Sequence, residues 1–444
     1  MANSMQYGVP NMALTTRSAI SVLISTFSLA SSTWAQWWVH ERLVEGLLVE
    51  PYYLYAFVSP SGVPVYRGGT ETGGNVFVGR RNFSLEVLGV THSAFPYGVT
   101  DDGRPIWEAL NRLYVGDADI SSSVATSVLN VPRQSGRGGY FSFEGFAGGR
   151  RVFVNETDVT TAALGPDGVG RLPSAPNSSG QVAWRGRPAG QTEWDLYVDD
   201  RNVSSFLGPG REIGGAWVDE AGHVFWSGKS ALTGNRNKAF LDNRDLTTEV
   251  FGIGAYGGAR GMNRRGDVLW IATSGPDQHV MLNTTNVSFP VVGGRLQLDP
   301  RALSEEGHVL WSAFGPEPGR WRLFRDSEEL NTNVIGFGSA VDTLSSKMNA
   351  TGHVLWAGGW TDLSALGVYY DSFNLSRDAF GLDYVPALPL AIGDGGHCLW
   401  FVERGTYPYA TYDVYLSTPV PEPGGALVTA LGFLGFLRRA RRSA

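Results

Sequence analysis

Four histidines occupy the same place in a repeated pattern, and histidine is the side chain most often used to bind metal ions or to move protons near neutral pH. Each follows a glycine and stands three residues before a tryptophan; they are His223, His308, His353 and His397. A zinc ion needs three or four ligands around it. Equivalent positions of a repeat lie a whole repeat apart, too far to share one ion. We therefore predict no metal site and expect a structural role, such as a bond to a neighbouring turn.

Paired carboxylates are the second group that could do chemistry. They occur at Asp101–Asp102, Asp199–Asp200 and Glu305–Glu306. Such pairs can bind calcium or cleave glycosidic bonds. None has the alternating Asp-x-Asp-x-Asp-Gly spacing of a calcium loop, and adjacent acids in turns are usually solvated. A hydrolase or lyase would need two carboxylates from different repeats about 5 to 10 Å apart, which the spacing alone does not establish.

Eight Asn-x-Ser/Thr sequons have the pattern of N-glycosylation acceptors. Aspartate replaces the asparagine in further copies of the same pattern, at Asp119, Asp158 and Asp245. A turn tolerates that exchange, whereas a glycosylation acceptor does not, so we interpret the sequons as turns. Their asparagines are Asn82, Asn155, Asn177, Asn202, Asn283, Asn286, Asn349 and Asn374.

The motifs that are absent, the cysteine count and the net charge exclude further classes of protein and partner. The chain has no Gly-x-Ser-x-Gly elbow, no phosphate loop and no His-Glu-x-x-His, so we predict no catalytic residue and no cofactor. Cys398 is the only cysteine, which excludes an intramolecular disulfide. The net charge is −7, and about −11 without the two terminal segments described below. This charge disfavours nucleic acids and anionic membranes as partners.

A repeat must position all of these residues. Six segments share the pattern Gly-x-apolar-x-Trp and follow one another at intervals of 41 to 45 residues, and looser copies begin at Gly62, Gly103 and Gly139. We predict that the tryptophans of the six segments are the main packing units between repeats. They are Trp184, Trp226, Trp270, Trp311, Trp356 and Trp400.

A second motif follows each copy by about 12 to 17 residues. It has a short aromatic strand, a polar turn, Asn or Asp, an apolar residue, and then Ser or Thr, as in Leu196 to Ser204 and Ala239 to Thr247. Four polar residues between apolar ones predict a β-hairpin whose Ser or Thr lies in a strand.

Strand-built repeats of this length are typical of β-propeller blades, and their length resembles that of kelch-like repeats. With 58 glycines and 14 tryptophans, they predict an all-β propeller of eight or nine four-stranded blades over residues 36–418. An open solenoid or two smaller β domains is the alternative. The last copy has only two strands, so residues 38–58 could supply missing outer strands and lock the ring.

Residues 1–35 have the order of a secretory signal peptide. Arg17 precedes a mostly apolar run, and small side chains end at Ala35, which predicts cleavage between Ala35 and Gln36. Met12 is an alternative start.

The other end of the chain, residues 419–444, contains three parts in a fixed order. Pro421, Glu422 and Pro423 precede an apolar stretch of 14 residues, which is shorter than the roughly 20 of a full membrane span. Four arginines close the chain: Arg438, Arg439, Arg441 and Arg442. This order resembles the PEP-CTERM sorting signal of Gram-negative bacteria. The resemblance implies a short transmembrane helix that anchors the chain transiently in the inner membrane and is removed by an exosortase-type enzyme.

Both ends therefore predict export through the export machinery, followed by a place on the cell surface or in the extracellular matrix. We expect a non-catalytic propeller that binds exopolysaccharide or surface proteins. An extracellular hydrolase or lyase that acts on polysaccharides is the alternative. A purely structural component of an envelope layer or matrix is a third hypothesis.

Overall fold

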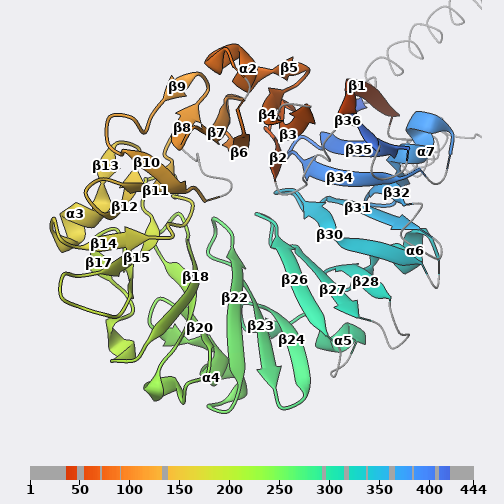
Figure 1. Ribbon diagram of the computed structural model, residues 1–444. Coiled ribbons are helices and arrows are strands. Elements are labelled where there is room, and N and C mark those ends of the chain that lie inside the picture. Colours follow the sequence, from red (N-terminus) through yellow and green to blue (C-terminus); the bar gives the residue numbers. More distant parts are fainter. Residues whose placement is uncertain are drawn as a thin grey trace, which may run out of the picture. The chain divides into compact units, whose positions relative to one another are not determined.

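Nine antiparallel sheets of four strands each follow one another around a ring in the computed structural model (Figure 1). The structure describes residues 37–47, 55–70, 73–90, 92–132, 139–292, 297–314, 320–336, 339–359, 366–382, 385–405 and 410–420. Contacts divide the chain into two units, and the propeller corresponds to the unit Val39–Thr418. The architecture is an all-β propeller with nine blades. The alternatives of eight blades, an open solenoid and two β domains are therefore wrong.

Strands within a blade pair in chain order, beginning with the strand nearest the ring axis; only the ninth blade differs. The first three blades are β2 (Ala56–Val58), β3 (Pro64–Thr70), β4 (Gly73–Val78) and β5 (Arg81–Asn82); β6 (Ala94–Val99), β7 (Pro105–Ala109), β8 (Arg112–Val115) and β9 (Ala118–Asp119); and β10 (Ser127–Asn130), β11 (Ser142–Phe146), β12 (Arg150–Val154) and β13 (Thr157–Asp158). The next three are β14 (Val169–Arg171), β15 (Ala183–Arg187), β16 (Asp195–Val198) and β17 (Arg201–Asn202); β18 (Glu212–Val218), β19 (Val224–Lys229), β20 (Lys238–Leu241) and β21 (Arg244–Asp245); and β22 (Tyr256–Met262), β23 (Val268–Ser274), β24 (Asp277–Leu282) and β25 (Thr285–Asn286). The last three are β26 (Leu298–Leu303), β27 (Val309–Phe314), β28 (Trp321–Arg325) and β29 (Glu328–Glu329); β30 (Ala340–Met348), β31 (Val354–Gly359), β32 (Gly367–Tyr370) and β33 (Phe373–Asn374); and β34 (Ala387–Ile392), β35 (Cys398–Arg404), β36 (Thr411–Val420) and β1 (Trp37–Leu47).

The Gly-x-apolar-x-Trp motif forms the second strand of every blade and the turn that leads into it. All nine motif glycines have φ between 79° and 91°, a left-handed conformation that glycine adopts at the lowest cost. The motif aromatic residue is fully buried in each blade. In eight blades it stacks on an aromatic side chain of the third strand, with ring centroids 4.2 to 5.4 Å apart. In the sixth blade Met281 takes the place of that partner.

Tryptophan has one polar atom that must find a partner when the ring is buried. In six blades the indole N–H donates to a backbone carbonyl of the turn after the third strand, at 2.7 to 2.9 Å. In the ninth blade Trp400 donates instead to the hydroxyl of Ser417, at 2.7 Å. The tryptophan therefore fixes the third strand and its turn to the second strand.

Both sides of the motif strand pack between blades. Trp226 lies in a buried cluster with Ala183 and Leu196 of the preceding blade. Its neighbour Phe225 lies in a different cluster, with Val268 and Trp270 of the next blade. Alternate side chains of the motif strand therefore face opposite neighbouring blades.

Short helices follow the fourth strands in seven blades, which corrects the hairpin prediction. Asn or Asp caps most of these helices, as where Asp245 Oδ1 accepts from the Thr248 N–H at 2.8 Å. The Ser or Thr two residues after this cap is buried, and its oxygen accepts a backbone N–H of the third strand; Thr247 accepts from Ala239 at 2.9 Å. The Asn/Asp-x-Ser/Thr pattern therefore encodes a cap and a strand contact. The helical segments are α2 (Phe83–Leu88), α3 (Val159–Leu164), η2 (Ser205–Leu207), α4 (Leu246–Phe251), α5 (Phe289–Val292), α6 (Leu330–Val334), α7 (Leu375–Phe380) and, in a loop, η3 (Ala231–Thr233).

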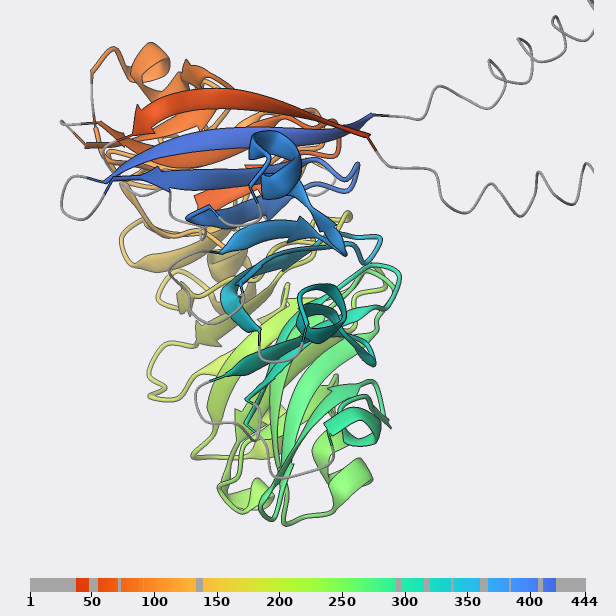
Figure 2. The same cartoon turned by 90° about the vertical axis from the view of Figure 1, so that its right-hand side faces the viewer.

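The N-terminal strand completes the last blade. β1 pairs with β36 as the outermost strand of the ninth sheet, and Figure 2 shows the two long strands side by side. Leu43 and Leu47 of β1 join a buried cluster that also contains Tyr66 of the first blade. This confirms the predicted closure, with one correction: residues 56–58 form the innermost strand of the first blade and not an outer strand of the ninth.

The two ends of each blade differ. Antiparallel order places the turns between strands one and two, and between strands three and four, at one end, which we call the turn face. The loops between strands two and three and the connections to the next blade lie at the other end, the loop face. Cleavage at Ala35–Gln36 and the tail from Pro421 to Ala444 lie outside the described residues. No described helix is long and apolar enough to cross a membrane.

Candidate functional site

The motif histidines bond the turn between the third and fourth strands of their own blade. In three blades Nδ1 lies 2.6 to 2.9 Å from the carboxylate of that turn; the pairs are His223–Asp242, His308–Asp326 and His353–Asp371. His397 contacts the hydroxyl of Thr418 instead, at 3.3 Å. The predicted bond to a neighbouring turn is confirmed. Among the described residues, no group of three His, Cys, Asp or Glu side chains could hold a metal ion.

The acidic pairs are parts of turns on the turn face. Asp199 has φ 52° and accepts a hydrogen bond from the Val182 N–H at 3.2 Å, which joins its turn to the motif strand. Asp102 accepts from the Thr100 hydroxyl and from Arg104 in the turn before β7. The Thr100 bond, helped by Arg104, lowers the pKa of Asp102. Glu305 accepts from the Arg264 N–H of the preceding blade at 2.8 Å. These contacts give all three pairs a structural role.

Asparagines on the turn face link one blade to the next. The Nδ2 atoms of Asn177, Asn263 and Asn349 donate to backbone carbonyls of the following blade, at 2.9 to 3.3 Å. Asn177 and Asn349 belong to sequons, and both are buried. A buried amide that holds two blades together leaves no room for a glycan, in agreement with the turn interpretation.

The residue directly after the motif aromatic residue differs in type from blade to blade. Its side chain faces the next blade, as Arg185 does where it donates to the Gly214 carbonyl at 3.0 Å. The first four blades carry charge at this position and the last five do not. From the first blade to the ninth the residues are Arg67, Glu108, Glu144, Arg185, Ser227, Ile271, Ser312, Ala357 and Phe401. Because the remaining five blades fold without a charge at this position, the four charged residues are the strongest candidates for function.

Three arginines gather around a tryptophan in the fourth blade, and we call this group the arginine–tryptophan cluster: Arg171, Arg185, Arg187 and Trp194. Arg171 pairs directly with Arg185 across strands β14 and β15, and Arg187 lies two residues further along β15. The guanidinium carbons of Arg171 and Arg187 lie 3.8 and 5.0 Å from the centroid of the Trp194 ring. Burial, together with neighbouring positive charge, lowers the pKa of Arg171 and of Arg185.

One acid approaches this cluster from the third blade. Glu144 is almost fully buried and accepts from the Leu172 N–H at 3.1 Å. It also forms an ion pair with Arg150, whose Nε lies 3.4 Å away. A single carboxylate thus faces four arginines, so the site keeps a net positive charge within a chain of net charge −7.

A second group lies between the first and second blades. Arg67 sits 4.1 Å from the ring centroid of Phe95, and Tyr55 packs against Phe95 and Tyr97. The Tyr97 hydroxyl donates to Glu108 at 3.0 Å. Burial raises the pKa of Glu108, although the Tyr97 bond opposes this shift.

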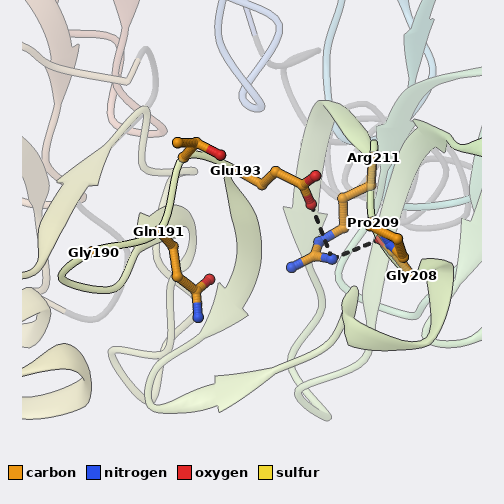
Figure 3. A pocket seen from close by; sticks show the side chains of 7 residues that line it. Gly190, Gln191, Glu193, Gly208, Pro209 and Arg211 are labelled. Carbon is orange, nitrogen blue, oxygen red and sulfur yellow. Dashed lines mark hydrogen bonds and ion pairs between the residues drawn. The ribbon is translucent and has the colours of Figure 1, made fainter.

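A shallow pocket of about 450 Å³ opens on the loop face between the fourth and fifth blades. Figure 3 shows Glu193 and Arg211 pointing toward each other across it, with Gln191 to one side. The Nη1 atom of Arg211 lies 3.4 Å from Oε2 of Glu193, and its Nε atom donates to the buried carboxylate of Asp195. These groups neutralise one another, so the pocket is a weaker candidate than the arginine–tryptophan cluster.

Sequence reasoning missed the cluster because it searched for repeated residues. A signal was available: an alignment of the nine motif copies shows charge after the aromatic residue in four consecutive copies. The contribution of Trp194 could not be found in this way, because it lies in a loop whose length differs between blades.

No known family model matches this chain, and no curated protein matches it. Among solved structures, an oligogalacturonate lyase in complex with manganese is similar at a TM-score of 0.32 and 10% sequence identity, over 88% of this chain and 97% of that chain. So low a score carries no information about activity.

Proposed function

We propose that this chain is an exported surface or matrix protein whose propeller binds polysaccharide or protein without catalysis. A charged site without repeat symmetry, in the arginine–tryptophan cluster, is the observation that carries the binding proposal. Stability alone does not account for it, since five blades hold the equivalent position with uncharged residues. Like charges directly opposite in a sheet destabilise it, so the presence of this arrangement supports a role in binding.

The binding proposal is tested with the purified full chain on a glycan array and on a matched array of matrix proteins. We expect retention of at least one class of polysaccharide or protein at micromolar concentration. An Arg185→Ser variant, which copies the residue of the fifth and seventh blades, should fold and should weaken that retention, because it lowers the positive charge of the cluster. Retention by neither array would contradict the proposal and would favour a purely structural role in an envelope layer.

Export is proposed from the two ends of the sequence, the signal-like segment before Gln36 and the tail from Pro421. We infer that the first directs the chain across the inner membrane and that the second holds it there until an exosortase-type enzyme removes it. Cell fractionation with mass spectrometry of the mature ends tests this. The full chain should begin at Gln36 and lack residues 421–444, whereas a chain without 421–444 should be released without a membrane stage. Recovery of intact ends in the cytoplasm would refute the inference.

An extracellular hydrolase or lyase is the second candidate, and Glu108 is the observation that favours it. A carboxyl group whose pKa is raised by burial can remain protonated and act as a general acid. Turnover of a labelled exopolysaccharide that disappears in Glu108→Gln would establish this candidate over the non-catalytic one.

A further inference from the structure

Three arginines on one side of the fourth blade form no ion pair with an acid, unlike several arginines elsewhere in the described ring, such as Arg211, Arg244 and Arg325. Cross-strand pairing of Arg171 with Arg185, and of Val169 with Arg187, places the three guanidinium groups on the same side of the sheet. Successive residues of a strand alternate between its two sides, so this placement follows from the register. By contrast, Arg211 in the same blade pairs with two carboxylates.

The hydrogen-bonding capacity of this cluster is mostly unused. Within the described part of the chain, neither Arg171 nor Arg187 has a hydrogen-bond or ion-pair partner, and the Nε atom of Arg171 is buried without an acceptor. A buried donor without an acceptor costs roughly 1–3 kcal/mol. Arg185 has the Gly214 carbonyl. The site therefore lacks acceptors, and an oxyanion would supply them.

Trp194 explains how the donors stay available. Its ring lies against the guanidinium groups of Arg171 and Arg187 and holds them by cation–π attraction, which leaves the N–H groups at the guanidinium edges unoccupied. Glu144 does not fill the site, because its oxygens are engaged by Leu172 and Arg150. Planar guanidinium groups with free edges match the two oxygens of a carboxylate or sulfate.

We propose that the arginine–tryptophan cluster binds the carboxylate or sulfate groups of an acidic polysaccharide, with Arg187 and Arg171 as the direct contacts and Trp194 as the positioning residue. The inference rests on the proposed function and names its ligand class. It gives a chain of negative net charge a local site for an anionic polymer. Neutral polysaccharides lack the group that the arginines require.

The test measures binding of fluorescent alginate, dextran sulfate and neutral dextran to the full chain at low salt. We expect alginate or dextran sulfate to bind, neutral dextran to bind at least tenfold more weakly, and affinity to fall as salt rises. Arg187→Gln should weaken binding of the acidic polymer about tenfold or more, and Arg187→Lys should recover only part of it. Arg260→Gln is the matched control, because Arg260 is an exposed arginine on β22 in another blade.

The outcomes separate this inference from the proposed function. Equal binding of all three polymers overturns the anionic ligand class and leaves a polysaccharide-binding propeller. Equal losses in Arg187→Gln and Arg260→Gln show that binding follows general charge, which overturns the site. If none of the three polymers binds, the acidic ligand is refuted, and the glycan and protein arrays then decide the proposed function alone. Preference for alginate identifies a carboxylate, and preference for dextran sulfate identifies a sulfate.

Discussion

At the scale of single residues, two histidines at the same motif position have pKa values shifted in opposite directions. His353 bonds the Asp371 carboxylate, and this bond raises its pKa, whereas burial lowers the pKa of His397, whose partner is the neutral Thr418. Histidine NMR titration should therefore place His353 above, and His397 below, the ordinary value of about 6.5. Asp371→Asn should bring His353 down toward that value. Identical titration of both histidines would contradict the assigned partners.

These shifts also fix the direction of two stability effects. A raised folded-state pKa means that the His353 contribution is fully present below the unfolded-state pKa and is lost as the pH rises through the folded-state value. For His397, with a lowered pKa, the contribution is present above the unfolded-state pKa and is lost as the pH falls through the folded-state value. His353→Gln should remove only the first trend, which denaturant unfolding at several pH values would measure.

Glu108 gives a second prediction at this scale. Burial raises its pKa, so ionisation costs stability as the pH rises from the unfolded-state value through the folded-state value. Glu108→Gln should therefore raise the melting temperature at pH 7 and leave it unchanged near pH 3.5. Tyr97→Phe removes the hydrogen bond that opposes the shift and should make the pH dependence steeper. A lower melting temperature for Glu108→Gln at pH 7 would refute this account.

Residues of this kind were only partly predictable. The structural role of the four histidines followed from their repetition, because a residue kept in several blades serves the blade. The proposed binding role of Arg171 and Arg187 could not be predicted from repetition, since it depends on the groups that surround them in the fold. Absence of an acceptor near a guanidinium group is a property of three-dimensional packing that spacing along the chain does not encode.

At the scale of elements, the second motif predicts the polar turn correctly but not the segment that follows it. The pattern places Thr247 in a strand, because threonine favours strands. Thr247 instead lies in the first turn of α4, where its hydroxyl accepts a hydrogen bond from the Ala239 N–H. Asp245 caps that helix. A six-residue helix has no clear periodic signal, so its cap was the one available sign.

A substitution at Thr247 tests this contact. Thr247→Val keeps the shape but leaves the buried Ala239 N–H without an acceptor, so the free energy of unfolding should fall by about 1–3 kcal/mol. Thr247→Ser retains the hydroxyl and loses only a methyl group, worth about 0.8 kcal/mol. Urea unfolding of both variants provides the comparison. If serine cost as much as valine, the methyl packing and not the hydrogen bond would explain this position.

At the scale of the whole molecule, the repeat length predicts a propeller, and the motif copies predict eight or nine blades, of which the structure has nine. Closure by the N-terminal strand was predicted from the two strands that the last copy lacks. The pairing of β1 with β36 also explains an exception in the ninth blade. There Ser417 accepts the indole N–H of Trp400 and contacts His40 of β1 at 2.7 Å.

Ser417 therefore joins β36 to both neighbouring strands, to β35 through Trp400 and to β1 through His40, and the second contact crosses the ring closure. Ser417→Ala should leave a buried indole N–H without an acceptor and release His40, at a cost of about 1–3 kcal/mol for the first loss alone. His40 also contacts Asp378 at 2.9 Å, so Asp378→Asn is a control that changes β1 contacts outside the core. Thermal unfolding should show one lowered transition for Ser417→Ala. An unchanged melting temperature would show that closure depends on backbone pairing alone.

The contact between β1 and β36 has a consequence for the timing of folding. His40 and Ser417 are separated by 377 positions, so β1 must wait for the synthesis of β36 before the two strands can pair. At the usual elongation rates of about 5–20 residues per second, this wait lasts roughly 20 to 75 seconds. Throughout that interval β1 has an unsatisfied edge and the ring is open. If the chain is exported as we propose, a translocation channel can accept it during this interval, before closure of the ring completes the fold.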